Sequence, residues 1–196
     1  MSGAAAPVPA AGEAGGRLPF PALAAGFLAL AVAIGIGRFV YTPILPAMAD
    51  GLGLTRAETG LIGSANFAGY LAGALASAHP FLLRARRLWL AGALGTCVAT
   101  LVAMSACSTL AAFVALRFVG GAASALGFVL ATALVMDRLT RTGRSDLAAL
   151  HYAGVGSGIA LSAAVVSIAR EAGSEWRGLW IISGVLALGL AGPILW

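Results

Sequence analysis

Residues 18–48 read LPFPALAAGFLALAVAIGIGRFVYTPILPAM and carry a single charged residue, Arg38. A helix that crosses a membrane needs about 20 predominantly apolar residues, because each residue adds about 1.5 Å and the hydrocarbon layer is about 30 Å thick. The stretch is therefore long enough for one span. Prolines at both ends predict a helix over about 22–46, with a kink or an end at Pro43 or Pro46.

The rest of the chain has the same character. Of its 196 residues, 60% are hydrophobic and only 10% are charged, and the mean hydropathy is +0.97. An average soluble domain is about half apolar and about a quarter charged. The composition excludes a soluble domain and indicates an integral membrane protein, in which about six spans leave no room for a soluble catalytic domain.

Apolar runs separated by charged or turn-forming residues predict an all-α, polytopic membrane protein. Its six transmembrane helices are expected at about residues 22–46, 57–83, 88–107, 110–136, 147–169 and 177–196. Thr55 and Glu58 form a capping-box pattern before the second helix. Residues 105–109, rich in Ser and Thr, predict the turn that separates the third helix from the fourth. Residues 1–17 are rich in Ala, Gly and Pro and predict a disordered cytoplasmic tail before the bundle, which is expected over residues 18–196.

The arginines are divided unequally between the two predicted sides of the membrane. Seven lie before the first helix or in the connections after the second and fourth helices, whereas three lie on the other side beside four acidic residues. The positive-inside rule therefore predicts a cytoplasmic amino terminus. All twelve basic residues are arginine, which is typical of a GC-rich bacterial genome and suggests the bacterial cytoplasmic (inner) membrane. Trp176 and Trp180 fit an interfacial aromatic belt.

Three ionisable residues fall well inside the predicted spans: Arg38, Arg117 and His151. Such residues are costly in hydrocarbon and are usually functional. Counting about 1.5 Å per residue places Arg38, Asn66 and Arg117 in one layer of the outer half of the membrane, and His151 only about 6 Å from the cytoplasmic edge. No Asp or Glu lies well within any predicted span. The two arginines therefore need an anionic substrate, a group outside this chain, or backbone carbonyls and water as partners.

Each of these residues also has a plain structural interpretation. Arg38 can snorkel to the outer interface, whereas Arg117 is too deep for this and favours a buried partner or a water-filled cavity. His151 is either a wet helix-end residue or the one intramembrane group that titrates near neutral pH. Glycines in small-residue stripes are expected to pack helices together. They are Gly69, Gly73, Gly120, Gly121, Gly154 and Gly158.

Two segments carry a family resemblance. Residues 35–46 (GIGRFVYTPILP) and 64–75 (SANFAGYLAGAL), together with residues 53–55, resemble the YbfB/YjiJ-type branch of the major facilitator superfamily. Arg117 followed by Gly120 and Gly121 is similar to the superfamily's fourth-helix motif, whose arginine is associated with proton coupling. The fifth helix lacks the Gly-Pro of the antiporter motif, and Ser77 stands where the loop motif has an aspartate.

The resemblance implies a secondary transporter with twelve helices in two halves, each half made of two inverted three-helix repeats. This chain is then expected to be the amino-terminal half, with its first and fourth helices lining a central cavity. The expected substrate-binding residues are Arg38, Tyr41, Asn66, Tyr70 and Arg117, and the expected coupling residues are Arg117 and His151. A small organic anion is the hypothesis for the substrate, because two intramembrane arginines face no intramembrane acid. The expected partners are the lipid bilayer, the solute, and the missing carboxy-terminal half or a second copy.

Two other functions compete with a transporter. The first is a non-transporting membrane subunit or a truncated remnant. The second is a six-helix intramembrane serine protease, but Val155 stands where its Ser157 motif needs glycine and His151 precedes the serine. No enzyme activity, metal, cofactor or nucleic-acid partner is expected. Cys97 and Cys107 are about 15 Å apart along one predicted helix and are expected to be packing residues.

Overall fold

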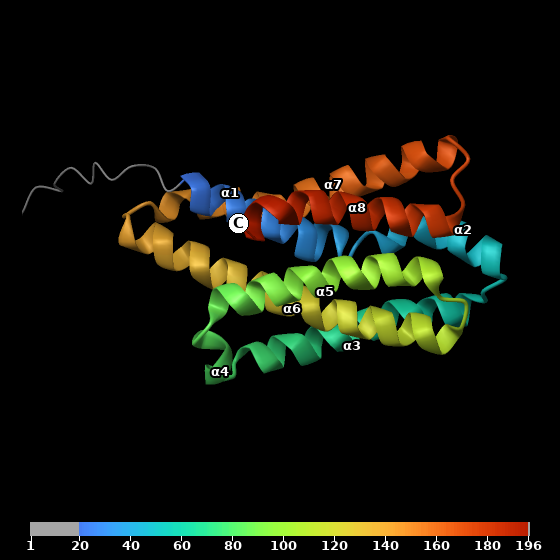
Figure 1. Cartoon of the computed structure of the whole chain (residues 1–196), viewed down its shortest axis with the longest axis horizontal. Helices are drawn as coiled ribbons and strands as arrows, with labels where there is room; N and C mark the ends of the chain where they lie inside the picture. Colours follow the sequence, from blue (N-terminus) through green and yellow to red (C-terminus); the bar gives the residue numbers. More distant parts are fainter. Residues whose placement is uncertain (1–19, 196) are drawn as a thin grey trace, which may run out of the picture.

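A computed structural model describes residues 20–195, and this part of the chain is helical with no strand. The helices run back and forth along one direction and form an elongated bundle (Figure 1). The predicted tail at residues 1–17 lies outside the described residues. The elements in order are α1 (Phe20–Leu30), the π-helical segment η1 (Ala31–Ile36), α2 (Tyr41–Leu52), α3 (Arg56–Ser77), α4 (Pro80–Leu83), α5 (Arg86–Ala106), α6 (Leu110–Arg141), the 3₁₀ turn η2 (Ser145–Leu147), α7 (Ala148–Glu171) and α8 (Trp176–Leu195).

Five helical segments in residues 20–195 are long and apolar enough to cross a membrane. They are Phe20–Leu52, Arg86–Ala106, Leu110–Arg141, Ser145–Glu171 and Trp176–Ile194. The 22 residues of α3 also suffice to cross about 30 Å, but its glycines, Ser64 and Asn66 make it less apolar than the other five. The chain is thus a multi-pass helical protein of the membrane type, and a sixth span at α3 stays a prediction.

The first span differs from its predicted shape. The end expected at Pro43 or Pro46 is wrong, since α2 runs through both prolines to Leu52; a kink at either proline stays a prediction. The irregular part comes earlier, where the π-helical segment η1 gives way to a turn at residues 37–40. Proline removes its own N–H and crowds the carbonyl four residues before it, so its effect falls on the preceding turn. Here the N–H of Thr42 donates to the Phe39 carbonyl at 3.1 Å.

Other helix ends follow local signals. The capping box before α3 is confirmed, because Glu58 accepts from the Thr55 N–H at 2.8 Å and the Glu58 N–H donates to the Thr55 hydroxyl at 3.2 Å. The second helix was expected to reach residue 83, but α3 ends at Ser77 because Pro80 forces His79 into an extended conformation. The turn between α5 and α6 lies where the sequence predicts it, with Thr109 capping α6.

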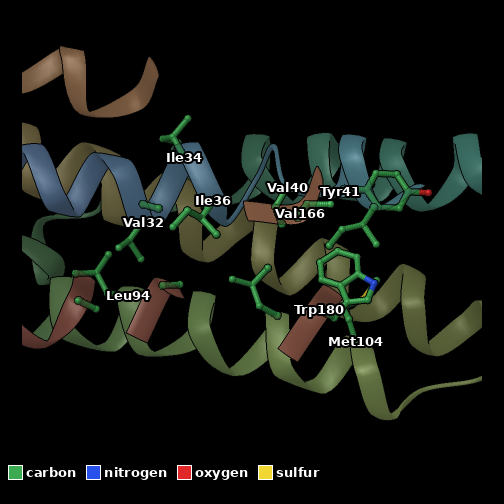
Figure 2. Packing of buried hydrophobic residues seen from close by; sticks show 14 of the residues in the cluster. Val32, Ile34, Ile36, Val40, Tyr41, Leu94, Met104, Val166 and Trp180 are labelled. Carbon is green, nitrogen blue, oxygen red and sulfur yellow. The ribbon is translucent and has the colours of Figure 1, made fainter. Parts of the chain in front are cut away.

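The first span lies at the centre of the bundle. In its most apolar stretch 61% of the residues are buried, against 28% in the corresponding stretch of the span that ends at Glu171. Figure 2 shows its side chains packed against Leu94 and Met104 of α5 and Trp180 of α8. The interfacial aromatic belt expected of Trp176 and Trp180 is wrong: both are buried, and the Trp180 ring stacks on Tyr41 with centroids 6.4 Å apart.

The two ends of the bundle differ in charge. We call the end with the α3–α5 and α6–α7 connections the arginine-rich end, and the opposite end the arginine-poor end. The arginine-rich end carries Arg84, Arg86, Arg87, Arg138, Arg141 and Arg144. Two ion pairs order it, Arg86 with Asp137 at 2.6 Å and Arg144 with Asp146 at 3.2 Å. The first pair joins the start of α5 to the end of α6, whereas the second lies within the connection between α6 and α7.

Candidate functional site

The irregular stretch of the first span leaves two backbone carbonyls without a backbone donor. The Gly37 N–H reaches back five residues to the Val32 carbonyl at 2.8 Å, which is the π-helical pattern. Farther along, Thr42 donates to Phe39, so no backbone hydrogen bond in residues 20–195 ends on the carbonyl of Gly37 or Arg38. Unpaired carbonyls at membrane depth are tolerated only where other groups pair with them.

Arg117 supplies both missing donors. Its Nη1 donates to the Gly37 carbonyl at 3.1 Å and its Nη2 donates to the Arg38 carbonyl at 2.8 Å. The side chain is only 4% exposed, and its guanidinium carbon lies 5.1 Å from the centre of the Tyr41 ring. Backbone carbonyls, one of the partners expected from the sequence, are therefore the partners of this arginine. It fastens α6 to the irregular stretch of the first span.

Asn66 joins α3 to the same point. Its side-chain amide donates to the Arg117 carbonyl at 3.0 Å, and the residue is 2% exposed. The close approach depends on Gly121, because a Cβ there would collide with the Asn66 carbonyl oxygen. Three helices thus meet at one polar cluster, which brings together Arg117 and Asn66 as the residue count along the helices predicted.

Arg38 points to a different environment from Arg117. Its guanidinium carbon lies 4.2 Å from the centre of the Tyr70 ring and 4.6 Å from that of Phe67, both on α3. A guanidinium over aromatic faces is held by cation–π attraction. Its Nε is buried with no hydrogen-bond partner, and no acidic side chain in residues 20–195 pairs with it. The guanidinium thus lies against aromatic rings of α3, and Arg38 is partly exposed.

Tyr41 braces the same region from the side of α2. Its hydroxyl donates to the Thr59 carbonyl at 2.9 Å, and its ring lies close to both Arg117 and Trp180. The side chain is buried. Tyr41 thus fixes the first turn of α2 relative to α3 and α8.

The glycines of the small-residue stripes lie where helices approach most closely. A Cβ on Gly69 or Gly73 of α3 would collide with the backbone of α6 at Phe118 or Ala122. On α7, Gly154 and Gly158 face the backbone of the first span at Phe27 and Ala31. On α6, a Cβ added to Gly120 would lie 3.1 Å from the Thr100 hydroxyl oxygen. These contacts set the spacing of the helices that hold the arginines.

His151 lies apart from the arginine cluster, near the arginine-rich end. It is 0% exposed, so the interpretation as a wet helix-end residue is wrong. Its Nε2 is hydrogen-bonded to the Thr132 hydroxyl at 3.1 Å, and its Nδ1 has no hydrogen-bond partner in the described residues. Gly26 makes room for the ring, because a Cβ there would lie 2.7 Å from Nδ1. His151 therefore links α1, α6 and α7.

Comparison with known proteins decides the family. A family model described as "Uncharacterised MFS-type transporter YbfB" matches residues 30–195. The chain belongs to this family. Comparison with curated proteins and with solved structures gives no match. The resemblance found in residues 35–46 and 64–75 is thereby confirmed, and the YbfB family is a family of transporters of the major facilitator superfamily.

Membership of the YbfB family bears on the competing functions. The multi-pass helical bundle and the transporter family together support a membrane transporter, without indicating its substrate. The protease alternative gains no geometric support, because Ser157 is exposed on α7 whereas the His151 ring is buried and bonded to Thr132.

Sequence reasoning missed the acceptors of this YbfB-family site. The carbonyls of Gly37 and Arg38 are backbone groups, so no residue type marks them. One signal for an irregular helix was present in the sequence: Gly35-Ile36-Gly37, followed six residues later by Pro43. Glycine is a weak helix former, and proline has no backbone N–H to donate. Trp180 was also missed, because its burial depends on the position of α8.

Proposed function

We propose that the chain forms one six-helix bundle of a secondary transporter that moves a small organic anion by alternating access. The observation that supports this most is the guanidinium of Arg38, which sits beside the irregular part of the central span without a carboxylate partner in residues 20–195. An uncompensated cation at this depth is costly. Binding of a carboxylate or phosphate group there offsets that cost, whereas a neutral solute does not.

The two arginines have different parts in this proposal. Both terminal nitrogens of Arg117 are occupied by carbonyls. Arg38 lies against aromatic faces and its Nε is buried, so we assign its two terminal nitrogens to the ligand. Tyr70 is only partly buried and borders the same guanidinium. We therefore assign substrate contact to Arg38 and Tyr70, and positioning of the site to Tyr41, Asn66 and Arg117.

Alternating access requires a second bundle that moves against this one. We propose that it is a further six-helix bundle, either in the same polypeptide or in a second copy. The π-helical stretch is suited to movement because π-bulges often mark functional positions in helices. Arg117 and His151 are the proposed coupling residues. Each of them joins the first span to α6. Each also has one buried nitrogen without a hydrogen-bond partner in the described residues, Nε in Arg117 and Nδ1 in His151.

Uptake by proteoliposomes tests the proposal. The chain is assayed with radiolabelled small carboxylates, an uncharged sugar and an amine. Arg38→Gln is expected to lower carboxylate uptake at least tenfold, Arg38→Lys to retain part of it, and Arg56→Gln, on the connection before α3, to leave it unchanged. His151→Gln is expected to flatten the pH dependence.

Three results would count against this reading. Equal uptake of a carboxylate by wild type and Arg38→Gln removes Arg38 from the substrate site. Absence of all uptake by this chain alone, despite stable insertion in the bilayer, counts against a carrier made of two copies. Absence of uptake by a polypeptide that also contains the second bundle favours the non-transporting subunit.

A further inference from the structure

Arg38 is the one positive charge that residues 20–195 offer to a ligand away from the ends of the helices. Both terminal nitrogens of Arg117 already donate to backbone carbonyls. His151 is 0% exposed and hydrogen-bonded to Thr132 near the arginine-rich end. The remaining arginines of this part of the chain lie near helix ends or in connections. The bundle can therefore balance a single negative charge of a ligand at this depth.

Aromatic rings surround this charge. The guanidinium carbon of Arg38 lies 4.2 Å from the centre of the Tyr70 ring, 4.6 Å from that of Phe67 and 5.6 Å from that of Phe39. Phe67 is 58% exposed and Phe39 is 36% exposed, so the bundle leaves much of both side chains uncovered. Of the three rings, only that of Tyr70 carries a polar atom. The surroundings of the charge are thus apolar apart from one hydroxyl.

One charge among exposed rings favours a particular kind of anion. A carboxylate accepts two parallel hydrogen bonds from the terminal nitrogens of a guanidinium. Its carbon body then lies beside the rings that flank Arg38, where burial of apolar surface is favourable. A second carboxylate, or a phosphate with two negative charges, brings a charge that the bundle does not balance. An unpaired charge in apolar surroundings is costly.

We propose that the ligand of Arg38 is an aromatic monocarboxylate. This inference rests on the proposed function and narrows its small organic anion to one charge and one ring. Arg38 selects the single charge, whereas Phe39 and Phe67 select the ring. Dicarboxylates and phosphate esters are disfavoured by their second charge. Small carboxylates without a ring are disfavoured because they leave the two phenylalanines uncovered.

Equilibrium binding to the purified chain in lipid nanodiscs tests this substrate class. Radiolabelled benzoate, acetate, phthalate and glucose are measured separately in a scintillation proximity assay. Phthalate has the ring of benzoate and a second carboxylate, whereas acetate has the charge of benzoate and no ring. Benzoate is expected to bind at least tenfold more tightly than phthalate and acetate, and glucose is expected not to bind.

Two phenylalanine variants separate the role of the ring from a general loss of apolar surface. Phe67→Leu is expected to weaken benzoate binding at least fivefold and to leave the weak acetate binding unchanged, because the ring is lost and the charge stays. Phe81 has a nearly equal exposed fraction, 56%, but lies on α4 at the arginine-rich end. Phe81→Leu is therefore the matched control and is expected to change neither.

An added cation tests the charge count directly. Ser64 is exposed and lies three residues before Phe67, so both residues share one face of α3. Ser64→Arg is expected to strengthen phthalate binding at least fivefold, because the second carboxylate then has a partner. Unchanged phthalate binding by this variant contradicts the selection by charge.

The outcomes distinguish this inference from the proposed function. Phthalate or acetate binding as tight as that of benzoate, with all three weakened in Arg38→Gln, overturns the aromatic monocarboxylate and leaves the anion site in place. Benzoate binding that Arg38→Gln does not change contradicts the proposed function itself. Equal effects of Phe67→Leu and Phe81→Leu overturn the role of the ring. Absence of binding by all three anions overturns both proposals.

Discussion

Arg117 illustrates how one side chain compensates for an irregular backbone. The π-helical stretch before Pro43 leaves the carbonyls of Gly37 and Arg38 without backbone donors, and the planar guanidinium reaches both at 2.8–3.1 Å. A lysine presents a single compact ammonium and matches two separated acceptors less well. The guanidinium of Arg117 thus stabilises the fold, in addition to its proposed role in coupling.

Replacing Arg117 tests this at the residue scale. Arg117→Met leaves two buried carbonyls unpaired, at about 1–3 kcal/mol each, and relieves the burial of one charge, so we expect a net destabilisation of about 2–4 kcal/mol. Arg117→Lys is expected to lose less. Thermal unfolding in detergent, followed by the reaction of the buried Cys97 thiol with a fluorescent maleimide, measures both. Unchanged unfolding of Arg117→Met would show that the carbonyls find other donors.

At the scale of elements, the contact between α3 and α6 depends on glycine. Gly69 and Gly73 of α3 and Gly121 of α6 let the two backbones approach so closely that an added Cβ meets a carbonyl group. Small residues at such crossings allow van der Waals packing, which drives helix association in membranes. The Asn66–Arg117 hydrogen bond is made at this crossing, so the packing of the helices and the geometry of the polar cluster are linked.

Two glycines on the same helix provide a matched comparison. Gly69→Ala is expected to destabilise the bundle by about 1–3 kcal/mol, because the Phe118 backbone cannot move away easily. Gly60→Ala meets nothing within 4 Å and is expected to stabilise α3 by about 0.5–1 kcal/mol through helix propensity. Both are measured by the same thiol-reactivity assay. Equal behaviour of the two variants would contradict the proposed role of the α3–α6 crossing.

At the scale of the whole molecule, the unequal ends predict an orientation. The positive-inside rule places the arginine-rich end in the cytoplasm. In a background of Cys97→Ala and Cys107→Ala, Ser108→Cys and Ser145→Cys place exposed thiols at the arginine-poor and arginine-rich ends. A membrane-impermeant maleimide is expected to label position 108 in intact cells and position 145 only after permeabilisation. The reverse pattern would mean that the arginines do not set the topology.

Much of this protein was determined by its sequence alone. Uncharged runs of about 20 residues can satisfy their backbone only as helices in a membrane, so the helical class and most helix positions follow from composition. Short sequence motifs predicted helix ends correctly where neighbouring residues alone determine them, as in the Thr55–Glu58 capping box. The residue count along the helices also predicted that Asn66 and Arg117 share one layer, because the rise of a helix is fixed.

The tertiary structure decided the features that depend on neighbouring helices. Pro43 was visible in the sequence, but the pairing of carbonyls 37 and 38 with Arg117 required the position of α6. The burial of His151 against Gly26, and that of Trp180 against Tyr41, likewise depends on which helix covers each side chain. The sequence pattern gives the position of a residue along its helix. The side chains that this residue contacts are determined by packing between helices that are distant in the sequence.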